Sequence, residues 1–378
     1  MTVIPRRILV VKLADIGDAV LALPAIQAIR AGYPNAEIDV LTTAAGANVF
    51  ELSPAVDRVL TLAKQRFDHI SGLISFRGIA ELVGLTARLR RGRYEAVFML
   101  HHLTTSFGAR KFRALARATA APIVVGLDNG RGAFLTHAAM DYGFGALPEW
   151  RYALSVVESF TGHARSSRPN IVVPESAGES ARRILERSLG DASRYAVIHA
   201  EVGDFSTARA WRDDYFAEVA RHLISTHDLP VLLVGTERDR AGHETLASLH
   251  RVHDLVGETT FPELCDIVRN ADLVVGCDSS VAHLAGAFNR PSITLFGPSN
   301  VNAWKPFGSV SKTITDRSKV DARSIACHLD MPCSPCLYTG YRLGRPQGCR
   351  SRACMMNMQP GEIIRIADSV LSVADASA

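Results

Sequence analysis

The sequence predicts an α/β protein built from two halves, each organised around a parallel β-sheet. Short apolar strands alternate with helices along almost the whole chain, which is the pattern of parallel β-α-β layers. The chain has 378 residues, which exceeds one ordinary hydrophobic core and favours about two domains. Serines and prolines gather at 164–176, so we expect the linker between the halves there.

The expected strands fall into two groups. In the first half they lie at 8–13, 37–42, 56–60, 94–100 and 122–126. In the second half they lie at 195–200, 230–235, 254–256, 272–277 and 292–296. Pro360 and Gly361 then open an amphipathic helix near the end of the chain. We therefore expect an N-terminal domain at 1–170, a C-terminal domain at 171–358 and a terminal helix at 359–378.

Composition and charge exclude several classes of protein. A hydrophobic content of 47% excludes a disordered chain. A net charge of +4 is too weak to indicate nucleic-acid binding, but it is compatible with anionic substrates or lipid headgroups. No run reaches the roughly 18 to 20 apolar residues of a membrane helix, and charged residues interrupt the apolar N-terminal stretch. We expect a cytoplasmic enzyme.

The first strand, loop and helix, at 8–31, place acidic side chains at a helix N-terminus. The helix dipole stabilises the ionised carboxylate of Asp18, which can therefore serve as a general base. Capping the helix is the commoner use of such an aspartate. Asp15 is a rival for the catalytic role, and Lys12 could balance the charge of the site.

Basic and polar side chains follow the expected strand 94–100 and could grip the phosphates or carboxylates of an anionic saccharide. The candidate contacts to such a ligand are His101, His102, Arg110, Lys111 and Arg113. A solvated helix face explains such a charge run equally well. A metal pair at the two histidines is disfavoured, because adjacent residues of a strand point to opposite faces.

A helix expected at 79–93 carries leucines at helical spacing together with four arginines. Such a helix could lie on an anionic membrane surface. A buried amphipathic helix explains the pattern just as well.

The loop after strand 195–200 carries hydroxyls and a cation. Ser206, Thr207 and Arg209 suit a pyrophosphate, because a guanidinium can bind two oxygens at once. A solvated Arg209 and a core aromatic at Trp211 are at least as common in a single loop.

Three acids in the second half need separate explanations. Glu201 and Asp204 lie in the same loop and would repel a phosphate unless they face away from it or bind sugar hydroxyls. Glu237 follows the expected strand 230–235, where its carboxylate could accept hydrogen bonds from sugar hydroxyls. An exposed acid at a helix entry is an equal alternative for Glu237.

The segment 271–300 sets a buried strand, a helix and a second buried strand in succession. The first strand ends at Asp278, and Ser279 and Ser280 are natural N-cap residues for the helix that follows. His283 lies one turn on and can donate to the same guest. Free backbone amides and the positive dipole end favour an anion, most simply a phosphate. Helix capping and a satisfied core histidine are the alternative explanation.

Seven cysteines without a signal peptide suggest reduced thiols. Cys333 and Cys336 form a CxxC pair, and Cys349 and Cys354 could complete a tetrahedral zinc site. A cysteine-containing loop without metal is the favoured interpretation, because the second spacing is unusual. The cysteines near the end of the chain are Cys327, Cys333, Cys336, Cys349 and Cys354.

Two stretches resemble glycosyltransferase family 9, the lipopolysaccharide heptosyltransferases. The residues Asp278, Ser279, Ser280, His283 and Gly286, followed by Phe296, Gly297, Pro298 and Ser299, resemble the donor-binding signature of that family. The stretch 6–43 is similar to the opening sequence of the family. Serines replace the usual Thr and Gly of the donor signature, and Arg209 replaces a lysine of a Lys-x-Trp pattern.

The resemblance implies a fold of GT-B type, with two Rossmann-like domains facing a central cleft. It implies an inverting, metal-independent transfer of heptose from ADP-heptose to an acceptor of lipopolysaccharide inner-core type, with no cofactor. It assigns the catalytic base to Asp18, a donor phosphate contact to Arg209 and a ribose contact to Glu237. It also implies that the terminal helix packs back on the N-terminal domain, and that the enzyme works at the cytoplasmic face of the inner membrane.

Three alternatives remain open at the level of sequence. The enzyme could use another nucleotide sugar or a glycan or small-molecule acceptor that is not lipopolysaccharide. It could be a nucleotide-binding oxidoreductase, although the first turn lacks GxGxxG. It could also bind a nucleotide sugar without turnover, in which case changing Asp18 would cost nothing.

Overall fold

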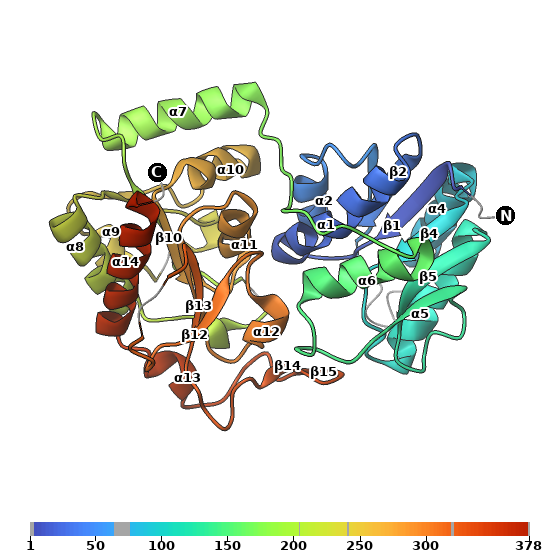
Figure 1. Cartoon of the computed structure of the whole chain (residues 1–378). Coiled ribbons are helices and arrows are strands. Elements are labelled where there is room, and N and C mark those ends of the chain that lie inside the picture. Colours follow the sequence, from blue (N-terminus) through green and yellow to red (C-terminus); the bar gives the residue numbers. More distant parts are fainter. Residues whose placement is uncertain (1–3, 64–75, 204, 240–241, 319–320, 377–378) are drawn as a thin grey trace. The chain divides into compact units, whose positions relative to one another are not determined.

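The computed structural model describes residues 4–63, 76–203, 205–239, 242–318 and 321–376 (Figure 1). The chain divides into two compact units. The first unit comprises Met1–Gly143 and Glu149–Val172, and the second comprises Phe144–Pro148 and Val173–Ala378. The main boundary therefore falls inside the expected linker, two residues later than the expected position, and a short segment before α6 belongs to the second unit.

The first unit is a six-stranded parallel sheet with the strand order β3-β2-β1-β4-β5-β6. Its strands are β1 (Arg7–Val11), β2 (Glu37–Thr42), β3 (Arg58–Thr61), β4 (Ala96–Met99), β5 (Ile123–Asp128) and β6 (His137–Met140). Its helices are α1 (Ile16–Gly32), α2 (Ala44–Phe50), α4 (Phe76–Gly92), α5 (Ser106–Thr119) and α6 (Glu149–Thr161). This strand order is that of a Rossmann sheet, in which ligands bind at the carboxyl ends of the strands.

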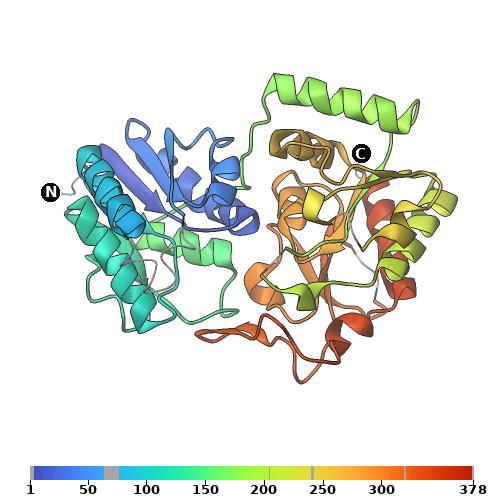
Figure 2. The same cartoon turned by 180° about the vertical axis from the view of Figure 1, so that it is seen from behind.

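Helices α4 and α5 lie side by side on one face of the first sheet (Figure 2). Leu85 and Leu89 of α4 are buried against Leu9 and Val97 of the sheet. Arg90 donates to the carbonyl of Ala118, at the end of α5, over 2.9 Å. The leucines of this amphipathic helix therefore form part of the core, as in the second of the two interpretations of 79–93.

The second unit is a seven-stranded parallel sheet with the order β12-β13-β11-β10-β7-β8-β9. Its strands are β7 (Ala196–His199), β8 (Val231–Leu233), β9 (Val252–Asp254), β10 (Leu273–Cys277), β11 (Ser292–Phe296), β12 (Val310–Thr313) and β13 (Ser324–His328). A separate antiparallel hairpin pairs β14 (Leu337–Thr339) with β15 (Arg342–Gly344). Strands β6, β12 and β13 were not predicted from the sequence.

Helices connect the strands of the second unit and cover its sheet. The longer ones are α7 (Glu175–Leu189), α8 (Asp213–His227), α10 (Phe261–Asn270), α11 (Ser280–Ala287) and α14 (Pro360–Asp375). The short ones are η2 (Thr207–Arg209), η3 (Glu237–Asp239), α9 (Glu244–Ala247), α12 (Val301–Trp304) and α13 (Ala353–Met356).

Helix α14 covers most of the stretch 359–378, where the sequence predicts a terminal helix. It packs against α8 and β11, and its apolar face, which includes Ile363, Ile366 and Val370, is fully buried in the core of the second unit. The terminal helix thus buries its apolar stripe within the core of the second unit.

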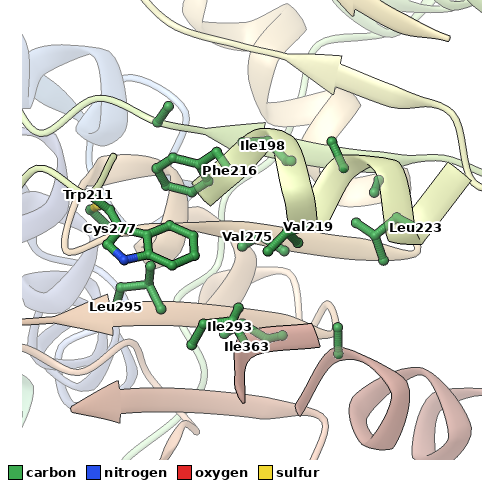
Figure 3. Close-up of a cluster of buried hydrophobic side chains, with 14 of the residues drawn as sticks. Ile198, Trp211, Phe216, Val219, Leu223, Val275, Cys277, Ile293, Leu295 and Ile363 are labelled. Carbon is green, nitrogen blue, oxygen red and sulfur yellow. The ribbon is translucent and has the colours of Figure 1, made fainter. Parts of the chain in front are cut away.

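The same core holds the strand ends that carry the candidate site (Figure 3). Trp211 is 5% exposed, lies beside Cys277 at the end of β10, and donates from Nε1 to the carbonyl of Met358 over 3.0 Å. Trp211 is therefore a core aromatic, and it anchors the loop that contains Arg209.

Candidate functional site

The carboxyl edge of the second sheet brings together three strand ends. Strand β10 lies between β7 and β11, so His199, Asp278 and the turn after Phe296 meet at one edge. Helix α11 begins immediately after β10, with Ser279 as its N-cap residue. The hydroxyl of Ser279 lies 2.9 Å from Nδ1 of His199. Within the described chain this hydroxyl does not cap the helix. The backbone N–H groups in the first turn of α11 can therefore donate to a bound ligand.

His283 is deeply buried in the second turn of α11. It is 4% exposed, and burial is the main cause that lowers its pKa to about 4. The imidazole is therefore neutral at pH 7, with one donor and one acceptor nitrogen. Its Nδ1 and the hydroxyl of Ser299 are buried and have no hydrogen-bond partner among the described residues. Buried polar atoms of this kind are normally satisfied, so a bound molecule is the natural partner for them.

Arg209 is locked at the same edge by four hydrogen bonds. Its Nη1 donates to the carbonyl of Asp278 over 2.9 Å and to the Asp278 carboxylate over 3.3 Å. Its other bonds go to the carbonyls of Val202 and Ser206. The side chain of Arg209 is only 13% exposed. The guanidinium thus balances the charge of Asp278, which would otherwise repel an anion at the start of α11.

The other residues predicted to bind the sugar donor differ in how exposed they are. Ser206 is buried, and its hydroxyl donates to the carbonyl of Pro346 over 2.6 Å, so it holds the loop. Thr207 is exposed at the start of η2, and Glu237 is exposed at the start of η3 beside Gly257. Ser280 is half-buried in the first turn of α11.

Glu201, one of the two acids in the loop after β7, pairs with a histidine. Its carboxylate lies 2.5 Å from Nε2 of His243, a histidine that is 7% exposed. Asp204, the second acid of that loop, lies outside the described residues. The pairing with His243 removes one of the two objections to an anion at this edge.

In the first unit, Asp18 lies in the first turn of α1, directly after the carboxyl end of β1. Asp18 is half-buried, whereas Asp15 is the exposed N-cap residue. Lys12 is 8% exposed at the end of β1. A carboxylate at this position is stabilised in its ionised form by the helix dipole.

His101 and His102, two of the predicted acceptor contacts, differ in their surroundings. Nε2 of His101 accepts a hydrogen bond from the backbone N–H of Leu13 over 2.7 Å, and the ring stacks on Phe112. His101 therefore orders the loop that leads to Asp18.

His102 is buried between two carboxylates. Its Nδ1 lies 2.9 Å from Asp141, and its Nε2 lies 3.1 Å from Glu149. Desolvation opposes the charge on this ring, but the bonds to Asp141 and Glu149 outweigh it and raise the pKa of His102 to about 9. Both ring nitrogens are thus engaged in a buried ion-pair network, and the expected acceptor contact is not open to His102 in this structure.

A hollow of about 800 Å³ beside α5 is lined by several arginines. Arg110, Arg113 and Arg117 line it from the helix, and Arg131 lines it from the loop after β5. In the ranges that the structure describes, none of these four guanidinium groups forms an ion pair. Lys111 points elsewhere, with Nζ 5.1 Å from the centre of the Phe107 ring. The hollow is suited to an anionic guest.

Cys333, Cys336, Cys349 and Cys354 lie close enough to act on one another electrostatically, whereas Cys327 stands apart from them. Cys327 lies in β13 inside the core, and burial raises the pKa of its thiol to about 12. Cys333, Cys336 and Cys349 are exposed, and Cys354 is buried. Among the described residues, no three of these thiols have their sulfur atoms all within 4.8 Å of one another.

Comparison with known proteins identifies the family. The model of glycosyltransferase family 9 (heptosyltransferase) matches residues 83–331, which is well over half of the chain. The chain belongs to glycosyltransferase family 9. It is 25% identical over 329 residues to lipopolysaccharide heptosyltransferase 2 of Escherichia coli K12, covering 82% of this chain and 87% of that protein.

Other family 9 proteins agree with this assignment. Lipopolysaccharide heptosyltransferase 1 of Pseudomonas aeruginosa is 26% identical over 342 residues, covering 88% of this chain and 86% of its own. The solved structure of E. coli ADP-heptose lipopolysaccharide heptosyltransferase II superposes with a TM-score of 0.71 at 20% identity, over 98% of this chain and 100% of that one. A family 9 glycosyltransferase from Veillonella parvula gives a TM-score of 0.72 at 17% identity, over 98% and 99% of the two chains. The predicted pair of parallel α/β domains of GT-B type is confirmed.

The sequence interpretation of this family 9 chain missed two residues of the sites. His199 and Arg131 were not singled out, although His199 lies in a predicted strand at the functional edge, which was an available signal. The pairing of Glu201 with His243 could not be found, because 42 residues separate them. No helix in the described part of the chain combines the length and apolar character needed to cross a membrane.

Proposed function

We propose that this chain transfers heptose from ADP-heptose to an acceptor of lipopolysaccharide inner-core type, with inversion at the anomeric carbon. Membership of family 9 and the relatives named as lipopolysaccharide heptosyltransferases support the choice of reaction. A similar E. coli heptosyltransferase was solved with ADP and with ADP-2-deoxy-2-fluoro heptose. The observation that carries the proposal is the uncapped start of α11 beside Arg209 and the unpartnered His283.

The donor diphosphate would sit at the N-terminus of α11. Backbone N–H groups after Ser279 and Ser280 would donate to its oxygens, and the dipole contributes about 0.3–1 kcal/mol, rising to about 2 kcal/mol where the geometry is partly buried. The neutral imidazole of His283 would donate a hydrogen bond to the same diphosphate. Glu237 is exposed and would accept hydrogen bonds from the ribose diol.

Arg209 would act mainly through its charge. A guanidinium has five N–H donors, and four hydrogen bonds already hold Arg209 to the protein. The fixed cation would stabilise the negative charge that develops on the departing ADP. Thr207 is exposed and could add a hydroxyl, whereas Ser206 supports the loop.

Asp18 would be the general base. Its carboxylate would remove the proton of the acceptor hydroxyl while that oxygen forms a bond to the anomeric carbon. The bond from the anomeric carbon to the phosphate oxygen of ADP breaks on the opposite face, which inverts the configuration. The charge on ADP would be met by α11 and Arg209, so the proposal includes no metal ion and no cofactor in catalysis.

The arginine hollow of the first unit is the proposed acceptor subsite. Carboxylate or phosphate groups of an inner-core saccharide would pair with Arg110, Arg113 and Arg131, which otherwise lack ion-pair partners in the described chain. Lys12 would balance the charge around Asp18, and His101 would keep its loop in place. Because such an acceptor is a glycolipid, we place the enzyme in the cytoplasm, in peripheral contact with the inner membrane.

The first test is the nucleotide preference of the purified protein. A ligand that binds the native state raises the melting temperature, so ADP, UDP, GDP and dTDP are compared at equal concentration. We expect a selective rise with ADP, followed by transfer from ADP-heptose to a heptose-free inner-core acceptor. A selective rise with another nucleotide would overturn the donor, and no rise with any would overturn the phosphate site.

A further inference from the structure

Two histidines and one aspartate converge on the outer side of the second unit, on elements that the proposed reaction does not use. His222 and His227 belong to α8, and Asp368 belongs to α14. Nε2 of each histidine lies 2.7 Å from the same carboxylate oxygen, Oδ1 of Asp368. Within the described ranges, this is the one group of three such ligand atoms that lie within 4.8 Å of one another.

The donor set is that of a borderline divalent ion. Two imidazole nitrogens and a carboxylate oxygen are ligands that Zn²⁺ takes in tetrahedral sites, with water in the fourth position. The side chains of His222, His227 and Asp368 are 23%, 25% and 46% exposed, which leaves one side open for that water. Tetrahedral ligands at zinc distances lie about 3.3 Å apart, so the two N–O distances need to open by only about 0.5 Å.

The surroundings hold the group in place. Nδ1 of His222 lies 3.3 Å from the hydroxyl of Thr226, which can accept a hydrogen bond from Nδ1–H and so leave Nε2 unprotonated and able to ligate. Leu223 of α8 and Leu371 of α14 are buried in the same core, so packing fixes the spacing of the two helices. A site built on packed helices is better organised for a metal than one on loops.

We propose that His222, His227 and Asp368 bind a divalent transition-metal ion, best fitted by Zn²⁺, that ties the C-terminal end of α8 to α14. Three coordinate bonds to the ion would replace the two hydrogen bonds between the histidines and Asp368. Its role is structural: it would stabilise the second unit, which carries the proposed donor residues, without taking part in sugar transfer. The inference stands independently of the proposed reaction.

The test measures Zn²⁺ binding in a protein without competing surface thiols. Cys333, Cys336 and Cys349 are exposed, so all three are replaced by serine. This triple variant is the parent for the test. Its melting temperature is recorded with excess Zn²⁺ and with a chelator, and its affinity is measured by calorimetry. His227→Asn and Asp368→Asn remove ligands, and His250→Asn, on an exposed turn of the same unit, is the matched control.

We expect the parent to bind Zn²⁺ and to melt at a higher temperature with Zn²⁺ than with chelator. Each ligand variant should bind at least roughly tenfold more weakly and lose that difference, whereas His250→Asn should retain both. The melting temperature with chelator shows whether each variant is folded, so a lost ion pair is not mistaken for lost metal. Equal Zn²⁺ affinity in the parent and both ligand variants, or no Zn²⁺ binding by the parent, would overturn the proposal and leave an ordinary ion-pair clamp.

Discussion

Arg209 and Asp278 form a largely buried ion pair at the point where β10 ends and α11 begins, with 3.3 Å between Nη1 and Oδ2. The side chains are 13% and 6% exposed, and the arginine also binds the backbone carbonyl of its partner. The pair joins a loop after β7 to a loop after β10. It places a cation, with its charge partly balanced, beside the free amides of α11.

Removing the cation should damage catalysis more than folding alone explains. Arg209→Met takes away the charge beside the leaving group, and we expect kcat to fall by about 10²- to 10³-fold. It also leaves Asp278 buried without a partner, which costs about 3–5 kcal/mol of unfolding free energy in typical buried pairs.

The double variant Arg209→Met/Asp278→Asn separates the two effects. It should recover most of the lost melting temperature but little of the lost kcat, because the cation is still missing. Recovery of kcat in the double variant would show that Arg209 serves only to neutralise Asp278.

Changing the proposed base should separate catalysis from binding. Asp18→Asn keeps the shape of the side chain but cannot accept the acceptor proton, so transfer should fall by about 10²- to 10⁴-fold. The ADP-dependent rise in melting temperature should be unchanged. Asp15→Asn, at the exposed N-cap of the same helix, is the control and should retain activity; a loss there and not at Asp18 would exchange the two roles.

The network of His102 predicts a decline in stability at alkaline pH. The pKa of His102 is raised from its ordinary value of 6.5 to about 9 in the folded protein, so the imidazolium favours the folded state. Its stabilisation is complete below about pH 6.5 and is lost as the pH rises through 9; the total is on the order of 2–3 kcal/mol.

His102→Gln should therefore lower stability at pH 6.5 and flatten its dependence on pH between 7 and 10. Urea unfolding of both proteins across this range gives the difference, which removes the contributions of other titrating groups. Parallel curves for the two proteins would contradict a charged His102.

Changing an arginine of the hollow should weaken binding of the acceptor without affecting binding of ADP. Arg113→Ala should raise KM for the acceptor by roughly 5- to 10-fold, because one charge-assisted contact is lost. The effect should shrink as ionic strength rises, and ADP binding should not change. Arg88→Ala removes an exposed cation from α4, outside the hollow, and should leave both values unchanged; equal effects of the two changes would indicate only a general attraction to anions.

The sequence by itself determined the local parts of this protein. The apolar run 273–276 with serines after it defined β10 and the start of α11, because strand burial and helix capping depend on neighbouring residues. The same logic placed Asp18 at the start of α1, and the motif resemblance identified family 9.

Only the tertiary structure decided which of these parts meet. Arg209 and Asp278 are 69 residues apart, and His199 and Ser279 are 80 apart. They meet because the sheet order sets β7 beside β10, and sheet order depends on long-range pairing that no local pattern encodes. The burial of His102 between Asp141 and Glu149, and the packing of α14 on α8, were decided in the same way: each apolar face and each buried charge took the partner that the folded core offered.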